Sequence, residues 1–480
     1  MAKNIMIAGT MSSAGKSFIV TALCRYYTNR GFRVAPFKSQ NMALNSYVTA
    51  DGLEMGRAQV AQAEACKKAP SVLMNPILLK PTTDVGSQVI VHGKAVGNMR
   101  AAEYFKYKTS LIPEIMSSYD QLAAENDIII IEGAGSIAEI NLKENDIVNM
   151  GLAALLDAPV LLVGDIDPGG VFAQLYGTLE LLENDERKRI AGLIINKFRG
   201  DVSLLTPGID MLEKKCGKAV LGVVPMAKVD LDEEDSITSA FAVRKDENAV
   251  IDIAIIRLPH ISNFTDFEAF KLIDKVGVRY VSEVTELGSP DLIILPGTKS
   301  TIGDLKWLFE TGLANCIQGL SVKIPVCGIC GGYQMLGLSV ADPEGIEGGG
   351  QATGLGLIPM TTVLACEKTT RQVSGTLQGF AGVFASLNGK EFEGYEIHNG
   401  QSFSVAGEKN DNIMGTYVHG VFDAAGIADA LVAALGRNKG INISSSTDLG
   451  QFKDRQYDEM ADIIAHALDM DALDKIIGLE

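Results

Sequence analysis

The chain has 480 residues, of which 47% are hydrophobic and 21% are charged, a composition typical of a globular protein with two or three domains. Its formal net charge of −17 argues against a nucleic-acid-binding surface, because contacts to phosphates need clustered Lys and Arg. It has no apolar run long enough to span a membrane and no signal-peptide pattern, and its seven Cys are scattered and odd in number. We therefore expect a cytoplasmic protein with reduced thiols and no membrane partner.

A glycine-rich motif over Gly9–Ser17 follows a predicted strand at 4–8 and precedes a predicted helix that ends near Gly31. Such a turn presents backbone N–H groups and a helix N-terminus to an anion, while Lys16 adds positive charge and the Ser17 hydroxyl can reach Mg²⁺. The spacing is not that of a standard P-loop, since the first glycine comes one residue early. A turn that serves only strand-to-helix geometry is the alternative. The residues predicted to bind a nucleotide here are Gly9, Thr10, Gly15, Lys16 and Ser17.

A second strand is predicted at Phe32–Phe37, followed by Lys38 and an amide- and hydroxyl-rich run at 39–46. This run directly follows a strand that is expected to end at the same sheet edge as the P-loop strand. Ligands of α/β proteins bind at this edge. Lys38 is therefore predicted to contact phosphate, and the amides are candidates for a polar substrate; a solvated loop is the alternative. A helix is expected to begin at Asp51, whose carboxylate is either its N-cap or a Mg²⁺ ligand.

The range 75–82 contains two prolines and is predicted to be a loop, and a short strand is predicted at 88–91. The apolar run Asp127–Ile131 then ends in Glu132 and a glycine-rich turn. A buried strand that delivers a carboxylate to its C-terminal end gives a P-loop site a second metal ligand. An exposed turn Glu is the alternative. The predicted metal ligands are Ser17, Asp51 and Glu132.

Further apolar runs at 159–164, 190–195 and 219–224 follow a βα rhythm, which predicts a parallel sheet. Asn196 follows the second of these runs and is a candidate for hydrogen bonding to a purine base, with turn chemistry as the alternative. An acidic run follows the last strand. We therefore expect three parts: an N-terminal domain at 1–235, a linker at 236–249 and a second α/β domain at 250–480.

In the second domain, Cys330 stands between small residues where a predicted strand at 326–329 meets a helix. This is the geometry of a nucleophile elbow, which exposes the side chain at a helix N-terminus and lowers the pKa of a thiol. The N–H groups of Gly331 and Gly297 are candidates for an oxyanion hole. Cys327 completes a C-x-x-C pattern, but it falls within the apolar strand and lacks a second ligand pair for zinc. Further strands are expected at 250–256, 278–281 and 292–295.

A thiol nucleophile needs a base, and the chain has only five His. His419 follows a strand-like run at 414–418 and lies C-terminal to Cys330 in the same predicted domain, so it is the first candidate. His398 competes with it, and a purely structural role is the alternative for either residue.

These motifs carry a resemblance to known families. The stretch 9–17 resembles the variant P-loop of the dethiobiotin synthetase group, and 328–334 with 417–420 resembles a class I glutamine amidotransferase domain. The chain as a whole resembles the cobyric acid synthase family nearly end to end. Its most specific segments are Lys-Ser-Gln-Asn-Met at 38–42 and Asn-Lys-Phe-Arg-Gly-Asp at 196–201. The resemblance implies a parallel-sheet P-loop domain followed by a flavodoxin-like α/β amidotransferase domain.

The resemblance also implies a reaction: the amidation of the b, d, e and g carboxylates of adenosylcobyrinic acid a,c-diamide, a corrinoid, with glutamine, ATP and Mg²⁺. Cys330 would be the glutaminase nucleophile and His419 its base. Most class I glutaminases have a Glu two residues after this His, but the position here is Val421, and the corrin amidases resemble this chain in lacking that Glu. Another group must therefore orient His419. Whether the protein forms a homo-oligomer is left open.

Two rival functions stay open at this point. One is the sister enzyme that amidates the a and c carboxylates, cobyrinic acid a,c-diamide synthase, whose segment after the second strand differs. The other is a P-loop regulatory ATPase with an inactive amidase domain, which intact Cys330 and His419 disfavour.

Overall fold

The computed structural model describes residues 2–83, 86–227, 229, 241, 246, 248–406, 408, 410–445 and 448–479. The chain forms two compact units. The first contains Met1–Ala43, Met55–Ser236 and Gln451–Glu480, and the second contains Leu44–Glu54 and Ile237–Gly450. The expected domains at 1–235 and 250–480 differ from these units in two segments, 44–54 and 451–480. The expected linker at 236–249 lies mostly outside the described residues.

The first unit is built on a six-stranded parallel sheet with the order β12-β11-β10-β1-β9-β2. The inner strands read as almost continuous apolar runs because helices cover both faces of such a sheet. This architecture confirms the predicted α/β class of the N-terminal half. The strands are β1 (Lys3–Gly9), β2 (Val34–Phe37), β9 (Ile128–Glu132), β10 (Val160–Asp165), β11 (Ile190–Phe198) and β12 (Val220–Pro225).

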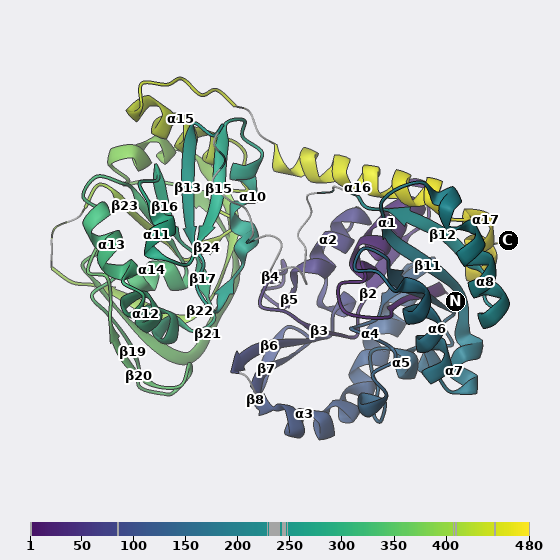
Figure 1. The fold of residues 1–480 in the computed structure, drawn as a ribbon. Coiled ribbons are helices and arrows are strands. Elements are labelled where there is room, and N and C mark those ends of the chain that lie inside the picture. Colours follow the sequence, from purple (N-terminus) through teal and green to yellow (C-terminus); the bar gives the residue numbers. More distant parts are fainter. Residues whose placement is uncertain are drawn as a thin grey trace. The chain divides into compact units, whose positions relative to one another are not determined.

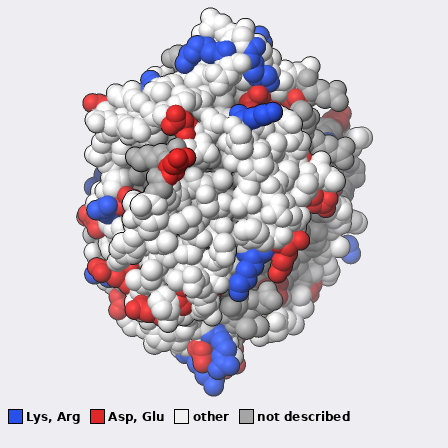
Figure 2. All heavy atoms as spheres, turned by 90° about the vertical axis from the view of Figure 1, so that its left-hand side faces the viewer, with Lys and Arg blue, Asp and Glu red and all other residues white. Residues whose placement is uncertain are grey.

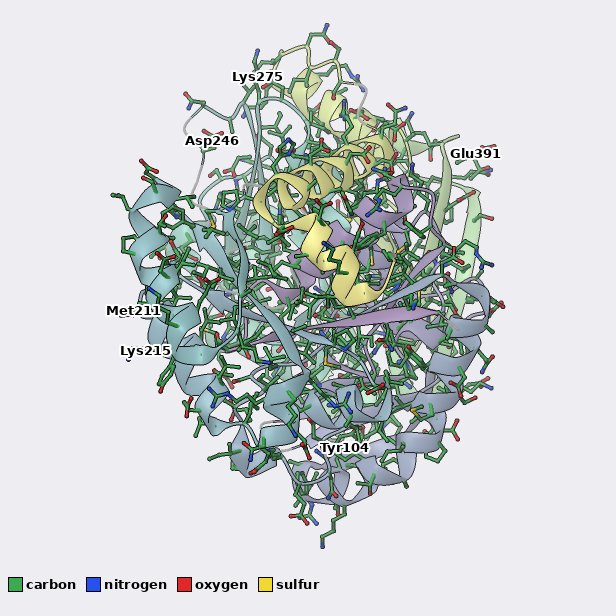
Figure 3. All side chains as sticks on the ribbon, turned by 90° about the vertical axis from the view of Figure 1, so that its right-hand side faces the viewer. Tyr104, Met211, Lys215, Asp246, Lys275 and Glu391 are labelled. Carbon is green, nitrogen blue, oxygen red and sulfur yellow. The ribbon has the colours of Figure 1, made fainter. Side chains whose placement is uncertain are left out.

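Helices of the first unit follow the βα rhythm (Figure 1). Helix α8 shows how the pattern selects a face: Leu212 and Cys216 are buried, whereas Met211 and Lys215 point outward (Figure 3). Residues one turn apart share a helix face, so this spacing separates the buried side from the exposed side. The helices are α1 (Lys16–Asn29), α2 (Arg57–Ala65), α3 (Ala101–Tyr107), α4 (Ile112–Glu125), α5 (Met150–Leu155), α6 (Val171–Leu181), α7 (Asn184–Arg189) and α8 (Thr206–Cys216).

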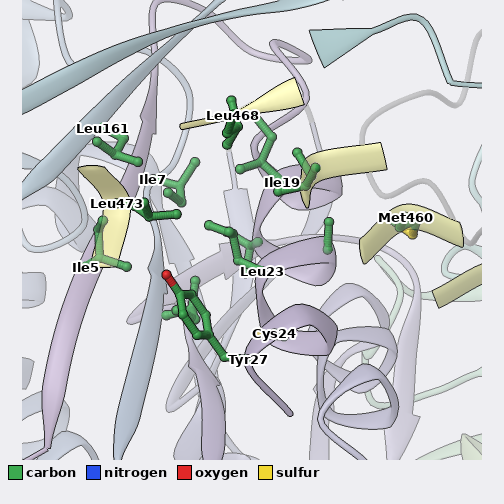
Figure 4. Packing of buried hydrophobic residues seen from close by; sticks show 14 of the residues in the cluster. Ile5, Ile7, Ile19, Leu23, Cys24, Tyr27, Leu161, Met460, Leu468 and Leu473 are labelled. Atoms are coloured by element: carbon green, nitrogen blue, oxygen red, sulfur yellow. The ribbon is translucent and has the colours of Figure 1, made fainter. Parts of the chain in front are cut away.

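The C-terminal helices α16 (Leu449–Ala467) and α17 (Met470–Ile477) belong to the core of the first unit (Figure 4). Leu473 is fully buried with Ile5 and Leu23 in one hydrophobic cluster. The side chain of Arg25 on α1 is also fully buried and pairs with two carboxylates of α16, Asp454 at 2.6 Å and Asp458 at 2.7 Å. Apolar packing and these ion pairs explain why 451–480 groups with the N-terminal sheet.

Replacing Leu473 with alanine should destabilise the protein by about 2–4 kcal/mol, because it leaves a cavity in a closed core. The midpoint of urea unfolding measures this loss. Leu204→Ala is the matched control, since Leu204 is 79% exposed and should change stability by less than about 0.5 kcal/mol. Equal midpoints for both variants would show that α17 does not dock on the sheet.

Two local predictions in the N-terminal part of the sequence are wrong. The range 75–82, expected to be a loop, contains most of β6 (Ile77–Thr83), which pairs with β3 (Gln40–Met42) and β7 (Gly86–Val91). Pro81 is tolerated because it lies beyond the end of the β3 pairing, where its missing N–H costs no ladder bond on that side. The expected helix start at Asp51 is instead a turn closed by hydrogen bonds between Thr49 and Leu53, and α2 begins only at Arg57. The sheet formed by β3, β6 and β7 also contains β8 (Lys94–Arg100).

The second unit has a five-stranded parallel sheet with the order β15-β13-β16-β18-β23. Four of its strands confirm predicted runs: β13 (Ile251–Ile256), β15 (Val276–Val281), β16 (Leu292–Leu295) and β18 (Val326–Ile329). The fifth is β23 (Ile413–Thr416), which overlaps the strand-like run expected at 414–418. Its helices are α10 (Glu268–Lys271), α11 (Val284–Leu287), α12 (Thr301–Glu310), α13 (Leu313–Leu320), α14 (Gly331–Leu336) and α15 (Ile427–Asn438).

A second sheet of this unit was not expected from the sequence. It is dominated by a long antiparallel hairpin of β21 (Met360–Thr376) and β22 (Glu391–Ser404). The other strands are β19 (Ser339–Asp342), β20 (Gly350–Thr353) and β24 (Val418–His419). Short strands β4 (Ser46–Val48), β5 (Glu54–Gly56), β14 (Ile261–Ser262) and β17 (Gly297–Thr298) complete the described strands.

The surface agrees with the moderate charge content of the sequence. Figure 2 shows one face with a broad uncharged centre, around which charged side chains of both signs are scattered. Within the described part of the chain, every helix is either too short or too polar to cross a membrane.

Candidate active sites

The P-loop joins β1 to α1 in a tight turn, and position 15 of this turn requires glycine. Gly15 has a φ of 89°, and a Cβ at this position would lie 2.0 Å from Nδ2 of Asn196. That amide group donates a hydrogen bond of 2.9 Å to the carbonyl oxygen of Ala14. The turn is therefore shaped by the end of β11, and it leads directly into the N-terminus of α1, which attracts an anion.

The other predicted P-loop residues lie in the same turn. Nζ of Lys16 donates to the carbonyl oxygens of Met11 at 3.3 Å and Gly135 at 3.1 Å. The Thr10 hydroxyl donates to Oε1 of Gln174 at 3.3 Å. A Cβ on Gly9 would approach both the Met11 carbonyl, at 2.9 Å, and the Lys16 ammonium, at 3.2 Å. The early glycine thus leaves room for the lysine side chain to cross the turn.

Glu132 is the centre of a buried polar cluster at the end of β9. Its Oε1 accepts from Oγ of Ser17 at 2.9 Å and from Nζ of Lys38 at 3.0 Å, and its Oε2 accepts from Nε2 of Gln62. Burial alone would raise the pKa of Glu132. The ammonium of Lys38, the hydrogen bonds and the charge of Lys16 outweigh it and lower this pKa. The structure thus brings the predicted residues Lys16, Ser17 and Lys38 close to the ionised carboxylate of Glu132.

Gln62 was not predicted. It lies on α2, fully buried, and holds the second carboxylate oxygen of Glu132. A signal was present, because glutamines at 59 and 62 interrupt an otherwise alanine-rich helix on its buried side. Nothing in the local pattern, however, indicates that this side faces a strand end rather than the apolar core.

The oxygen atoms around Glu132 fit a hard divalent cation. The hydroxyl of Ser17 and the carboxylate of Glu132 are oxygen ligands, and Oε1 of Gln62 is buried without a hydrogen-bond partner among the described residues. No group of three or more His, Cys, Asp or Glu suited to a metal occurs among those residues. A single carboxylate with hydroxyl and amide oxygens suits Mg²⁺, which keeps several waters and is otherwise held by nucleotide phosphates. Asp51 is exposed on a turn and belongs to the other unit, so its role as a ligand remains a prediction.

The end of β11 supports the P-loop from the other side. Asn196 uses its amide group to hold Ala14, so the predicted contact with a purine base remains untested. The neighbouring Lys197, which was not predicted, donates to the carbonyl oxygen of Ser13 at 2.6 Å and to Oδ2 of Asp165 at 2.8 Å. Lys197 therefore links the P-loop to the carboxylate at the end of β10.

Cys330 lies at a sharp turn between β18 and α14 in the second unit. Its φ of 51° is unusual for a residue other than glycine. The turn also requires glycine at 332, where a Cβ would lie 2.0 Å from the carbonyl oxygen of Leu295. Cys327, by contrast, is fully buried in β18, and burial raises the pKa of its thiol to about 12. Both cysteines are thus buried, Cys330 with 7% exposure at a strained strand end and Cys327 inside the strand, so the expected exposure of the Cys330 side chain is wrong.

His419 forms a hydrogen-bonded chain with a carboxylate that was not predicted. Its Nδ1 donates to Oδ2 of Asp266 at 2.7 Å, and the N–H of Gly420 donates to Oδ1 of the same residue at 3.0 Å. Burial alone would lower the pKa of His419, but Asp266 and the hydrogen-bonded Cys330 raise it to about 10. The arrangement therefore favours an imidazolium beside the sulfur of Cys330.

The apolar side chain of Val421 cannot accept a hydrogen bond from His419, whereas the carboxylate of Asp266 does. Val421 is buried with 1% exposure, whereas Asp266 comes from the short 3₁₀ helix Phe264–Phe267. The sequence gives no signal for this pairing, because more than 150 residues separate the two groups. The competing His398 lies against Tyr417, with ring centroids 3.8 Å apart, and its Nδ1 bonds the carbonyl oxygen of Gly400 at 2.8 Å.

The two predicted oxyanion residues lie at this site. A Cβ on Gly297 would be 3.0 Å from Cε1 of His419, and a Cβ on Gly331 would be 2.7 Å from Cγ2 of Thr298. Either substitution would therefore crowd the site. Gly331 directly follows Cys330 and is the first residue of α14.

Replacing Asp266 with asparagine should reduce kcat/KM for glutamine hydrolysis roughly 10²- to 10⁴-fold, because the imidazole loses its orientation and its raised pKa. Glutamate release at pH 7 measures this effect. Asp291→Asn is the control, since Asp291 lies before β16, at the opposite end of the sheet from Cys330. Equal rates in the two variants would exclude Asp266 from the site.

Comparison with known proteins agrees with this pair of sites. Residues 5–239 match the CobQ/CobB/MinD/ParA nucleotide binding domain, and residues 252–427 match the CobB/CobQ-like glutamine amidotransferase domain. These matches define the class: a glutamine amidotransferase joined to a nucleotide-binding domain.

Full-length relatives identify the family within this class. The chain is 54% identical to a cobyric acid synthase of Ruminiclostridium cellulolyticum, with 100% of this chain and 98% of the relative covered. It is 55% identical to that of Lachnoclostridium phytofermentans, with 99% of each covered, and 48% identical to that of Listeria monocytogenes, with 99% and 97% covered. The chain belongs to the cobyric acid synthase family.

Proposed function

We propose that the protein uses glutamine, ATP and Mg²⁺ to amidate the b, d, e and g carboxylates of adenosylcobyrinic acid a,c-diamide, giving adenosylcobyric acid in the cytoplasm. The observation that carries the proposal is the presence in one chain of two candidate sites. One is the Cys330–His419–Asp266 group, and the other is the P-loop with its buried Glu132. The family membership supports the identity of the acid substrate.

In the glutaminase half, the thiolate of Cys330 attacks the side-chain amide carbon of glutamine and forms a thioester. His419 gives its proton to the leaving nitrogen, and ammonia departs. His419 then accepts a proton from the water that cleaves the thioester, which releases glutamate and restores the thiolate. The N–H groups of Gly331 and Gly297 stabilise the oxyanion in both steps. Asp266 keeps the imidazole ring in place throughout.

In the synthetase half, the residues of the first unit hold and neutralise the phosphates. ATP supplies the phosphoryl group that converts each carboxylate into an acyl phosphate, since a carboxylate is a poor electrophile. Lys16 and Lys38 offset the charge on the transferring group. Ser17, Glu132 and Gln62 would hold Mg²⁺ through their oxygen atoms. Ammonia then attacks the acyl phosphate, displaces phosphate and forms the amide.

The test is an incubation of purified protein with the corrin diamide, glutamine, ATP and Mg²⁺, followed by mass spectrometry of the corrin. We expect four added amide groups. A parallel reaction supplies cobyrinic acid without amides. Amidation of only its a and c carboxylates would identify the sister activity, and no amidation of either corrin would contradict the proposed function.

A further inference from the structure

The two candidate oxyanion residues, Gly297 and Gly331, meet at one side chain, that of Thr298. Thr298 directly follows Gly297 in the segment 296–300, which we call the oxyanion loop. Its methyl carbon Cγ2 faces Gly331, where an added Cβ would lie only 2.7 Å away. The position of Thr298 therefore determines how closely the loop approaches the N-terminus of α14.

A buried carboxylate outside the loop holds the hydroxyl of Thr298. The hydroxyl donates to Oδ2 of Asp304 at 2.5 Å and accepts from the N–H of Ser300 at 3.1 Å. Asp304 is fully buried in the first turn of α12, where the helix N-terminus favours a negative charge. A buried carboxylate is costly unless it is hydrogen-bonded, so the bond to Thr298 stabilises both residues in one arrangement.

His260 joins the same carboxylate to the strand that pairs with the loop. Its Nδ1 bonds to Oδ1 of Asp304 at 2.7 Å, and its backbone N–H donates to Oδ2 at 3.1 Å. The His260 carbonyl oxygen accepts from the N–H of Lys299 at 3.0 Å. Two residues further on, Ser262 of β14 is the register partner of Gly297. Every described hydrogen bond to the Asp304 side chain thus comes from the oxyanion loop or from the turn that leads into β14.

The loop lies against the glutaminase histidine, so its position matters for the chemistry. A Cβ on Gly297 would be 3.0 Å from Cε1 of His419. A shift of the loop toward His419 would crowd the ring, and a shift away would lengthen the contact between the N–H of Gly297 and the oxyanion. Such donors act at about 2.7–3.1 Å from the developing charge, so a small displacement weakens them.

We propose that Asp304 is a positioning residue of the glutaminase. It acts through Thr298 and His260 to hold the N–H of Gly297 where the oxyanion forms. Its loss lowers kcat for glutamine hydrolysis more than it changes KM, because the oxyanion exists only in the reacting complex. The inference rests on the proposed function, because that function supplies the tetrahedral intermediate whose charge the loop stabilises.

The first test compares two variants of Thr298 in the full-length protein. Thr298→Val keeps the shape of the side chain and removes the hydroxyl, whereas Thr298→Ser keeps the hydroxyl. We expect kcat for glutamate release to fall roughly 10- to 100-fold in Thr298→Val, with KM for glutamine within roughly twofold of the parent value. Thr298→Ser should retain most of the parent kcat, because its hydroxyl still reaches Asp304. Equal losses in the two variants would overturn the proposal.

Asp304→Asn should show the same separation of kcat from KM. Alkylation of Cys330 by iodoacetamide is the second readout, because this reaction needs the thiol but forms no oxyanion. Mass spectrometry of the peptide that contains Cys330 follows the reaction. We expect parent rates of alkylation in Asp304→Asn and Thr298→Val. Alkylation that slows in both variants as much as glutamine hydrolysis would overturn the proposal, since the whole site would then be disturbed.

Asp252→Asn is the matched control for the loss of a buried carboxylate. Asp252 bonds Nε of Arg279 at 2.7 Å near the start of β13, at the opposite end of the sheet from Cys330. This variant should lower the midpoint of urea unfolding and leave kcat at the parent value. A loss of kcat as large as that in Asp304→Asn would show that destabilisation alone explains the effect.

The failure of this inference is distinguishable from that of the proposed function. A parent protein that hydrolyses no glutamine would contradict the proposed function. A parent protein that hydrolyses glutamine, with an unchanged kcat in both Asp304→Asn and Thr298→Val, would overturn only the positioning role of Asp304.

Discussion

Replacing Cys330 with alanine is expected to abolish amidation from glutamine, by roughly 10⁴-fold or more, while leaving amidation from added ammonium intact. The structure supports this separation because Cys330, His419 and Asp266 all lie in the second unit, whereas Lys16, Lys38 and Glu132 lie in the first. Without the sulfur no thioester forms and glutamine releases no ammonia. Free ammonia can still attack the activated carboxylate.

The experiment follows amide formation with each nitrogen source separately. Ammonium is supplied at a slightly alkaline pH, because at neutral pH most of it is protonated and unreactive. Cys327→Ala is the matched control: this neighbouring thiol is buried in β18 and should be dispensable for both activities. Equal loss of both activities in Cys330→Ala would show that the proposed division of labour is wrong.

Replacing Lys16 with alanine should abolish amidation from both nitrogen sources, by at least roughly 10²- to 10³-fold. Lys16 crosses the P-loop to the carbonyl oxygens of Met11 and Gly135, and its charge also lowers the pKa of Glu132. Removing it takes away one of the two lysine cations of the proposed phosphate site. Neither glutamine nor ammonium can compensate, because the acid is no longer activated.

Unstimulated glutamine hydrolysis in the Lys16→Ala variant should persist and thereby report a folded second unit. Lys215→Ala is the control for a lysine of the same unit, since Lys215 points outward from α8 (Figure 3). Survival of ammonium-dependent amidation in Lys16→Ala would exclude the P-loop as the site of carboxylate activation.

Local sequence patterns predicted the two parallel sheets because each strand is an apolar run that ends in a turn signal. The strand-end residues could be read in the same way: Glu132 after β9, Cys330 after β18, and Lys38 after β2 all stand where α/β folds place functional groups. A strand end fixes a side chain through the backbone alone, so spacing is sufficient to predict where it lies.

The features that the sequence did not predict depend on contacts between distant segments. Asp266 reaches His419 from another part of the second unit. Helix α17 packs on β1 although the two elements lie at opposite ends of the sequence. Their local patterns are an ordinary turn and an ordinary amphipathic helix. The same holds for the segment Leu44–Glu54, whose polar residues resemble a solvated loop until Tyr395 and Asn263 are placed against Ser46. Such pairings are specified by tertiary packing and leave no periodic signal.

The most direct test of two cooperating sites is the origin of the new amide nitrogen. The protein is given the corrin diamide, ATP and Mg²⁺ with glutamine labelled with ¹⁵N at its side-chain amide, in the presence of an equal concentration of unlabelled ammonium at neutral pH. If the thiol site supplies the nitrogen to the phosphate site, mass spectrometry will find ¹⁵N in the corrin amides. Amides that contain only ¹⁴N, formed while labelled glutamine is hydrolysed, would contradict the account.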